Sequence, residues 1–195
     1  DWRYYAEKER KARYDLDEAE VRPYLQLEQM IAAAFDTANR LFGLHFREIE
    51  NPPRYHPDVR AWEVTDGEGR HVGVFLGDYF ARPSKRSGAW MSGLRGQEKL
   101  AGDIRPIITN TCNFAKAPDG EPTLLSMEDA RTLFHEFGHA LHGLLSDVKY
   151  PSLAGTSVSR DFVELPSQLY EHWLTTPELL AEFALHHDPG EPMPR

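Results

Sequence analysis

Three histidines and one glutamate interrupt an otherwise apolar run between Leu133 and Leu145. His135, Glu136 and His139 have the spacing H-E-x-x-H. On a helix, residues four apart differ by about 40° around the axis and one turn along it, so both imidazoles can reach one ion from the same side. Zinc takes imidazole ligands at about 2.0–2.1 Å. The pattern therefore predicts a metal site, with Glu136 placed beside it to take a proton from water.

His142 shares this face of the predicted helix, but it lies about 10.5 Å along the axis from His135, too far to bind the same ion. Pairing it with His139 instead would leave Glu136 without a role. We therefore expect His142 to support the site from outside or to lie at the surface. The alternative is a helix with partly buried histidines and no metal, but the three residues would coincide by chance on the order of once in two hundred chains of this length.

A catalytic zinc site needs a third protein ligand and one open position. A zincin pattern with Gly at position 142 and His at position 145 does not occur here. The remaining candidates downstream are Asp147, Asp161, Glu164, Glu171 and His172. Glu164 stands among Phe162, Val163 and Leu165, where a carboxylate without a partner is costly and a cation removes that cost. The sequence thus favours Glu164 as the third ligand.

Three polar residues share the predicted helical face of Glu164, at spacings of i−3, i+4 and i+7. They are Asp161, Gln168 and Glu171. Each is a candidate to accept the second N–H of a ligating histidine and so fix its tautomer. The alternative for each is an ordinary polar side chain facing solvent.

Composition narrows the class of protein. The 195 residues are 41% hydrophobic and 27% charged, as in one globular domain, and the net charge of −9 argues against nucleic-acid binding. No apolar run is long enough to cross a bilayer, and the first residues do not resemble a signal peptide. Cys112 is the only cysteine, so we expect it to pack inertly and the protein to be cytoplasmic. We expect the basic cluster around Lys85 and Arg86 to be a solvated loop.

Hydrophobic periodicity and turn residues predict an α+β fold, mostly helical, with a small, mostly antiparallel sheet. Helices are expected over 2–42 with a boundary at Pro23, over 126–145 with a capping box from Ser126 and Asp129, over 161–174 and over 177–187. Strands are expected within 59–66 and 70–80, joined by a hairpin at "DGEG", and within 88–92 and 104–114. The three parts, helical 1–43, sheet-containing 44–115 and zinc-binding 126–187, are expected to belong to one catalytic domain over 1–195.

The segments "FHEFGHALH" and "YPSLAGTSVSRDFVELPSQLYEHW" closely resemble the zinc oligopeptidases of the thimet oligopeptidase family. Upstream, "YHPDVRAWEV" and "GDYFARPSKRSGAWMS" look most like its bacterial peptidyl-dipeptidase (dipeptidyl carboxypeptidase) branch. The resemblance implies a mostly helical body with a deep channel and the zinc helix on its floor. It implies one Zn²⁺ per chain held by His135, His139 and Glu164, with Glu136 as general base.

The resemblance also suggests where a peptide binds. Gly88 to Ser92, with Ala89 and Trp90, would form an edge strand that hydrogen-bonds an extended peptide; the alternative is an interior strand. The loop over 150–157, with Gly155, would cover the substrate, or it is a plain connection between helices.

Family members also carry a Gly- and Tyr-rich segment far downstream that contacts the substrate, and this chain contains no such segment. We therefore expect a fragment of the catalytic region, with oligopeptide substrates, no membrane partner and a complementing remainder of the same enzyme. Three functions stay open: a zinc peptidase that releases C-terminal dipeptides, an endo-oligopeptidase, and a zinc-binding fragment without catalysis.

Overall fold

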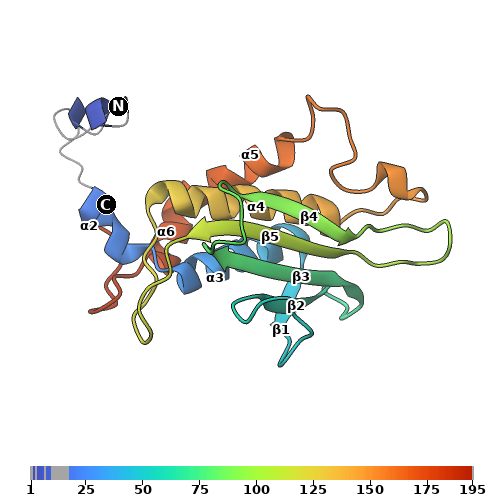
Figure 1. The fold of residues 1–195 in the computed structure, drawn as a ribbon, viewed down its shortest axis with the longest axis horizontal. Coiled ribbons are helices and arrows are strands. Elements are labelled where there is room, and N and C mark those ends of the chain that lie inside the picture. Colours follow the sequence, from blue (N-terminus) through green and yellow to red (C-terminus); the bar gives the residue numbers. More distant parts are fainter. Residues whose placement is uncertain (1, 3, 7, 10–17, 195) are drawn as a thin grey trace.

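A five-stranded sheet forms one layer of the computed structural model, which describes residues 2, 4–6, 8–9 and 18–194 (Figure 1). Its strands are β1 (His45–Glu48), β2 (Arg60–Thr65), β3 (His71–Phe80), β4 (Trp90–Arg95) and β5 (Ile107–Phe114). They lie in the order β1-β2-β3-β5-β4, so β4 is at one edge. The expectation of an edge strand in this region is confirmed, although Gly88 and Ala89 precede the strand itself.

The sheet is mixed, because β3 pairs with β5 in parallel while the other three pairings are antiparallel. The expectation of a small, mostly antiparallel sheet is therefore confirmed, with one parallel pairing that the sequence did not indicate. The chain after β3 passes to the outer position and forms β4 first, and β5 then returns between β3 and β4. The hairpin between β2 and β3 is confirmed. Strand β1 was not expected, because its four residues "HFRE" are mostly polar and exposed.

The helices follow the predicted order with shorter spans. They are α2 (Glu18–Val21), α3 (Leu27–Phe42), α4 (Met127–Leu144), α5 (Leu165–Glu171) and α6 (Pro177–Phe183), with 3₁₀ turns at Arg22–Tyr24, Pro151–Leu153 and His172–Thr175. Pro23 lies in the first of these turns and separates α2 from α3, as expected. Residues 3, 7 and 10–17 of the predicted N-terminal helix lie outside the described part. No helix among the described residues is long and apolar enough to span a bilayer.

The long helix α4 begins with the predicted capping box. The Ser126 side chain accepts a hydrogen bond from the Asp129 backbone N–H at 3.0 Å, and the Ser126 N–H donates to the Asp129 carboxylate at 3.1 Å. Two of the free N–H groups at the helix start are satisfied in this way, which fixes where α4 begins. The histidine pattern is thereby placed in the middle of a helix of 18 residues.

The core lies between one face of the sheet and the helices α3 and α4. Phe134 and Phe137 of α4 share one buried cluster with Met30 of α3 and with Phe75 and Ile108 of the sheet. Cys112 belongs to this core and is fully buried, and burial raises the pKa of its thiol, so inert packing describes it well. The second buried cluster is small. The elements that position the site therefore belong to the main core, between the sheet and the helices.

The basic segment between β3 and β4 differs from the expected solvated loop. Arg86 is exposed, but the Lys85 side chain is only 4% exposed and lies beside buried Asp78. Charge patterning could not reveal this, because the partner is provided by a strand whose other residues are apolar or neutral.

Candidate metal centre

Helix α4 presents His135 and His139 on one side, one turn apart. Their ring centroids are 4.9 Å apart and their planes nearly perpendicular. The side chains are 25% and 12% exposed, so neither is fully enclosed in the core. The spacing in the sequence therefore produces the expected pair of imidazoles.

Glu164 comes from the turn that precedes α5 and reaches the same point. Its Oε2 lies 3.2 Å from Nε2 of His135 and 3.2 Å from Nε2 of His139. One ligand atom from each of the three residues lies within 4.8 Å of the others. Ligands at 2.0–2.1 Å around a tetrahedral ion are about 3.3 Å apart, so these separations fit a single zinc ion.

The reach of Glu164 depends on a close approach between α4 and α5 at Gly138. A Cβ at Gly138 would lie 2.7 Å from Cα of Ser167 and 2.9 Å from the carbonyl oxygen of Pro166. Only glycine leaves room for the α5 backbone at this distance. The Ser167 hydroxyl, fully buried, lies 2.9 Å from Glu164 Oε2 and 2.9 Å from its carbonyl oxygen.

Sequence reasoning did not identify Gly138 and Ser167. The signal for Ser167 was available, since a hydroxyl three residues after a carboxylate can reach back to it on a helix. The contact of Gly138 with α5 was not available, because it depends on how the two helices pack. The predicted helix over 161–174 begins only at Leu165, directly before Pro166, and residues 160–164 form turns.

Glu171 lies beside His135, as the sequence suggested. Its Oε1 is 2.6 Å from Nδ1 of His135. A carboxylate in this place favours the tautomer whose proton is on Nδ1, which donates a hydrogen bond to Glu171 and leaves Nε2 free toward Glu164. Arg131 lies 3.9 Å from the same carboxylate.

Glu136 is 6% exposed and follows His135 directly in α4. Burial raises the pKa of its carboxyl group to about 7; the His135 ring opposes this change and Glu164 adds to it. Its Oε2 has no hydrogen-bond partner among the described residues. A carboxyl group whose pKa is near neutral pH can both accept and return a proton.

A cleft of about 570 Å³ runs past these groups. Its lining includes Ala89 near the start of β4, Met127 and Arg131 of α4, and His135 and Glu136. The residue directly before the edge strand β4 and the histidine helix α4 therefore border one space. An extended chain lying in this cleft would pass both the edge strand and the buried carboxyl group.

The other expected peptide-binding residues are less closely placed. Gly88 has a positive φ of 91° just before β4, and the Arg86 guanidinium stacks 4.5 Å from the Trp90 ring. Gly155 does not line this cleft. Its N–H donates to the Ser146 hydroxyl at 2.6 Å, which ties its loop to the end of α4.

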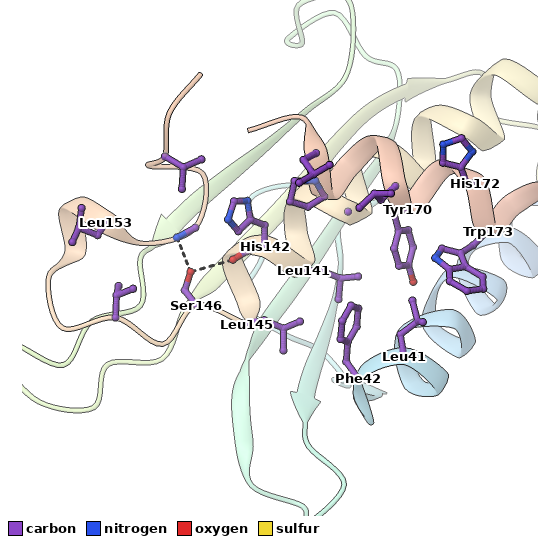
Figure 2. A pocket seen from close by; sticks show the side chains of 17 residues that line it. Leu41, Phe42, Leu141, His142, Leu145, Ser146, Leu153, Tyr170, His172 and Trp173 are labelled. Atoms are coloured by element: carbon purple, nitrogen blue, oxygen red, sulfur yellow. Dashed lines mark hydrogen bonds between the residues drawn. The ribbon is translucent and has the colours of Figure 1, made fainter. Parts of the chain in front are cut away.

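Gly155 and His142 instead line an apolar groove of about 720 Å³ (Figure 2). Leu41, Phe42, Leu145 and other apolar side chains of α3, α4 and α5 surround it. Burial lowers the pKa of the His142 ring, and its Nδ1 has no partner among the described residues. Asp161 and Gln168 are exposed, and within the described chain no hydrogen bond joins either side chain to a ligand histidine.

Comparison with known proteins identifies the family of the chain. The model of peptidase family M3 matches residues 1–195. The chain therefore belongs to peptidase family M3, a family of metallopeptidases.

Among individual relatives, the chain is 49% identical to the dipeptidyl carboxypeptidases of Salmonella typhimurium and Escherichia coli, over all of this chain and 28% of theirs. It is 38% identical to oligopeptidase A of Escherichia coli, over 98% of this chain and 29% of that protein. The chain thus spans less than a third of the relatives it matches.

Proposed function

We propose that this chain is the metal-binding part of a zinc peptidase that cleaves short peptides. One observation carries the proposal: Glu164 Oε2 lies 3.2 Å from Nε2 of both His135 and His139, and buried Glu136 lines the adjoining cleft. A structural zinc site would be closed by four protein ligands. Three ligands beside an open cleft fit a catalytic site instead.

In this proposal His135, His139 and Glu164 hold one Zn²⁺. Zinc so held would supply a Lewis acid that activates water and polarises a peptide carbonyl. Glu136 accepts the proton of the attacking water and later gives it to the leaving amine. Glu171 keeps the proton of His135 on Nδ1 and so keeps Nε2 available as a ligand. The free edge of β4 pairs with the backbone of an extended substrate, with Gly88, Ala89 and Trp90 at its start.

Glu136→Gln tests the assigned role, in the longer enzyme of which we propose this chain to be a part. Gln keeps the shape of Glu but cannot take a proton. We therefore expect turnover to fall at least about 1,000-fold, because the general base and the activation of water are both lost. Zinc content, measured by atomic absorption, should stay at one per chain. Turnover close to that of the parent enzyme would disprove the role of Glu136.

We propose release of C-terminal dipeptides as the specific activity. Its support is the higher identity to the relatives named dipeptidyl carboxypeptidase, 49% against 38% for oligopeptidase A. Endo-oligopeptidase activity is the alternative. Mass spectrometry of the products from a defined ten-residue peptide separates the two: successive losses of two C-terminal residues support the first, and internal cuts support the second.

A zinc-binding fragment without catalysis is the second candidate. Relatives are more than three times as long as this chain, and the groove at His142 is apolar and open. We infer that the remainder of a longer polypeptide covers this groove and completes the substrate channel. Cleavage of peptides by the 195 residues alone would rule out the non-catalytic reading, and cleavage only after adding the remainder would support it.

Domain and location belong to the same proposal. We infer that residues 1–195 form part of one catalytic domain, and that the protein is cytoplasmic; the unpaired, buried Cys112 supports a reducing compartment. The net charge of −9 supports peptides and not nucleic acids as its ligands.

A further inference from the structure

The connection between β3 and β4, residues 81–89, ends at the cleft. Its last residue, Ala89, shares the lining of the cleft with His135 and Glu136. A peptide that pairs with β4 depends on where this connection delivers the strand. Two polar side chains that the site itself does not use, Lys85 and Asn113, hold the connection in place.

Lys85 fastens the middle of the connection to the ends of two strands. Its ammonium lies 2.9 Å from the carbonyl oxygen of Asp78, 2.6 Å from that of Phe80 and 2.8 Å from that of Cys112. Three N–H donors thus meet three backbone acceptors, two at the end of β3 and one near the end of β5. The side chain is only 4% exposed, so water does not compete for these bonds.

Asp78 balances the buried charge. Its Oδ1 lies 2.8 Å from the Lys85 ammonium, and Arg82 adds two hydrogen bonds at 2.6 and 2.7 Å. The Tyr55 hydroxyl donates to the same carboxylate at 3.0 Å. A buried ammonium is tolerated only with such partners, so the connection can hardly move without breaking several charged contacts.

Asn113 fastens the far end of the connection. Its Nδ2 donates to the carbonyl oxygens of Arg86 at 2.8 Å and Gly88 at 2.7 Å. Both protons of one amide are therefore used on the two residues around the turn. Gly88 has a φ of 91° here, a conformation that other residues seldom adopt.

We propose that Lys85 and Asn113 are positioning residues that set the place of Ala89 and the start of β4 against the cleft, and so control how an extended peptide binds. The inference rests on the proposed function for its substrate. It assigns no chemical step to either residue: both act through the backbone of the connection.

The test uses the longer enzyme with Lys85→Met and Asn113→Asp. Met keeps most of the length of lysine without its charge, and Asp keeps the shape of asparagine without its two donors. Matched controls are Lys116→Met, whose ammonium pairs with Asp58 at the surface, and Asn39→Asp, whose amide donates to the Leu44 carbonyl oxygen away from the cleft. Lys85→Arg tests whether another cation can replace the contacts of the lysine ammonium.

We expect KM to rise on the order of tenfold in both variants while kcat changes less than about threefold, because peptide placement and not proton transfer is disturbed. Hydrogen exchange should accelerate at least tenfold in β4 and stay slow in β2 and β3. Neither control should change either quantity, zinc should remain at one per chain, and Lys85→Arg should lie between Lys85→Met and the parent.

Unchanged exchange in β4 would overturn the proposal, as would equal acceleration in β2 and β3, which indicates general destabilisation. A fall in kcat as large as the rise in KM would also overturn it. So would a rise in KM in either control variant. If the parent enzyme cleaves no peptide, the proposed function fails, but the exchange experiment still decides whether Lys85 and Asn113 hold β4.

Discussion

At the scale of single residues, the contact between Glu171 and His135 is short and direct. Glu171 Oε1 lies 2.6 Å from Nδ1 of His135. Loss of such a carboxylate behind a zinc ligand typically weakens metal binding about 10–100-fold, so we expect this fall for Glu171→Ala. Competition against a chromophoric chelator measures it. Glu171→Gln, which still offers an acceptor oxygen, should recover part of the loss, and Glu178→Ala on α6 should bind zinc like the parent; unchanged affinity in Glu171→Ala would contradict the assignment.

Asp78 gives a second prediction for a single residue. Burial raises the pKa of its carboxyl group, but the hydrogen bonds from Arg82 and the positive charge of Lys85 outweigh burial and hold the pKa below its usual value. A lowered pKa contributes stability above the pKa of the unfolded chain, about 3.9, which is lost as pH falls through the lower folded value. Asp78→Asn lacks this contribution and leaves two cations unbalanced.

We therefore expect Asp78→Asn to lower the free energy of unfolding near pH 7 by about 3 kcal/mol or more. The difference from the parent should shrink as pH falls from about 4 toward the lower pKa of the folded carboxyl group, because the unfolded parent binds a proton there before the folded parent does. Urea unfolding followed by circular dichroism across this range measures both. A difference that stays constant down to pH 2 would contradict the ionised pair, and Asp58→Asn at the surface serves as control.

At the scale of elements, the metal centre depends on how closely α5 approaches α4. We expect Gly138→Ala to weaken zinc binding at least tenfold, because the new Cβ would lie 2.7 Å from Cα of Ser167 and must push away the turn that carries Glu164. The change would otherwise favour the helix by about 1 kcal/mol. Zinc affinity and thermal unfolding together measure the two effects.

Gly143→Ala is the matched control for this prediction. Gly143 lies in the same helix, but a Cβ there would meet the Ile108 side chain at 2.7 Å and not the α5 backbone. Its substitution should destabilise the fold without a comparable loss of metal affinity. Equal loss of affinity in both variants would show that the approach of α5 at Gly138 has no special importance.

The same elements show how far the sequence could predict the structure. The start of α4 and the two imidazoles follow from local rules, because a capping box and an i, i+4 spacing involve neighbours in the chain. Flanking residues alone pointed to Glu164, although its side chain is half-exposed and lies in a turn, not inside a helix.

What the sequence did not predict depends on distant contacts. The parallel pairing of β3 with β5 and the packing of α5 on Gly138 join segments far apart in the chain. Lys85 was expected in solvent. Its partners, Asp78 and three backbone carbonyl oxygens, could not be foreseen because they come together only in the folded sheet. A single basic residue in a Pro- and Gly-containing segment carries no local sign of such burial.

At the scale of the whole molecule, α4 borders two hollows of different character. The cleft along its first half is lined by several charged groups, and the groove along its second half is lined mainly by leucines and aromatic rings (Figure 2). Large apolar side chains are exposed there, including Phe42 at 49% and Leu169 at 55%. An open apolar surface of this kind is typical of an interface, which agrees with a chain that spans 28% of its relatives.

The metal should also stabilise the whole molecule, because its ligands join α4 to the turn before α5. A ligand that binds only the folded state adds about 2.7 kcal/mol at a concentration 100 times its Kd. We expect the thermal unfolding midpoint to rise with the logarithm of zinc concentration, and this rise to be much smaller in Glu164→Gln, which loses one anionic ligand. Differential scanning calorimetry of both proteins measures the slopes, with Mg²⁺ as a control that two imidazoles should not bind. Equal slopes for the two proteins would mean that Glu164 does not hold the ion. A midpoint that zinc does not change would disprove the proposed metal centre.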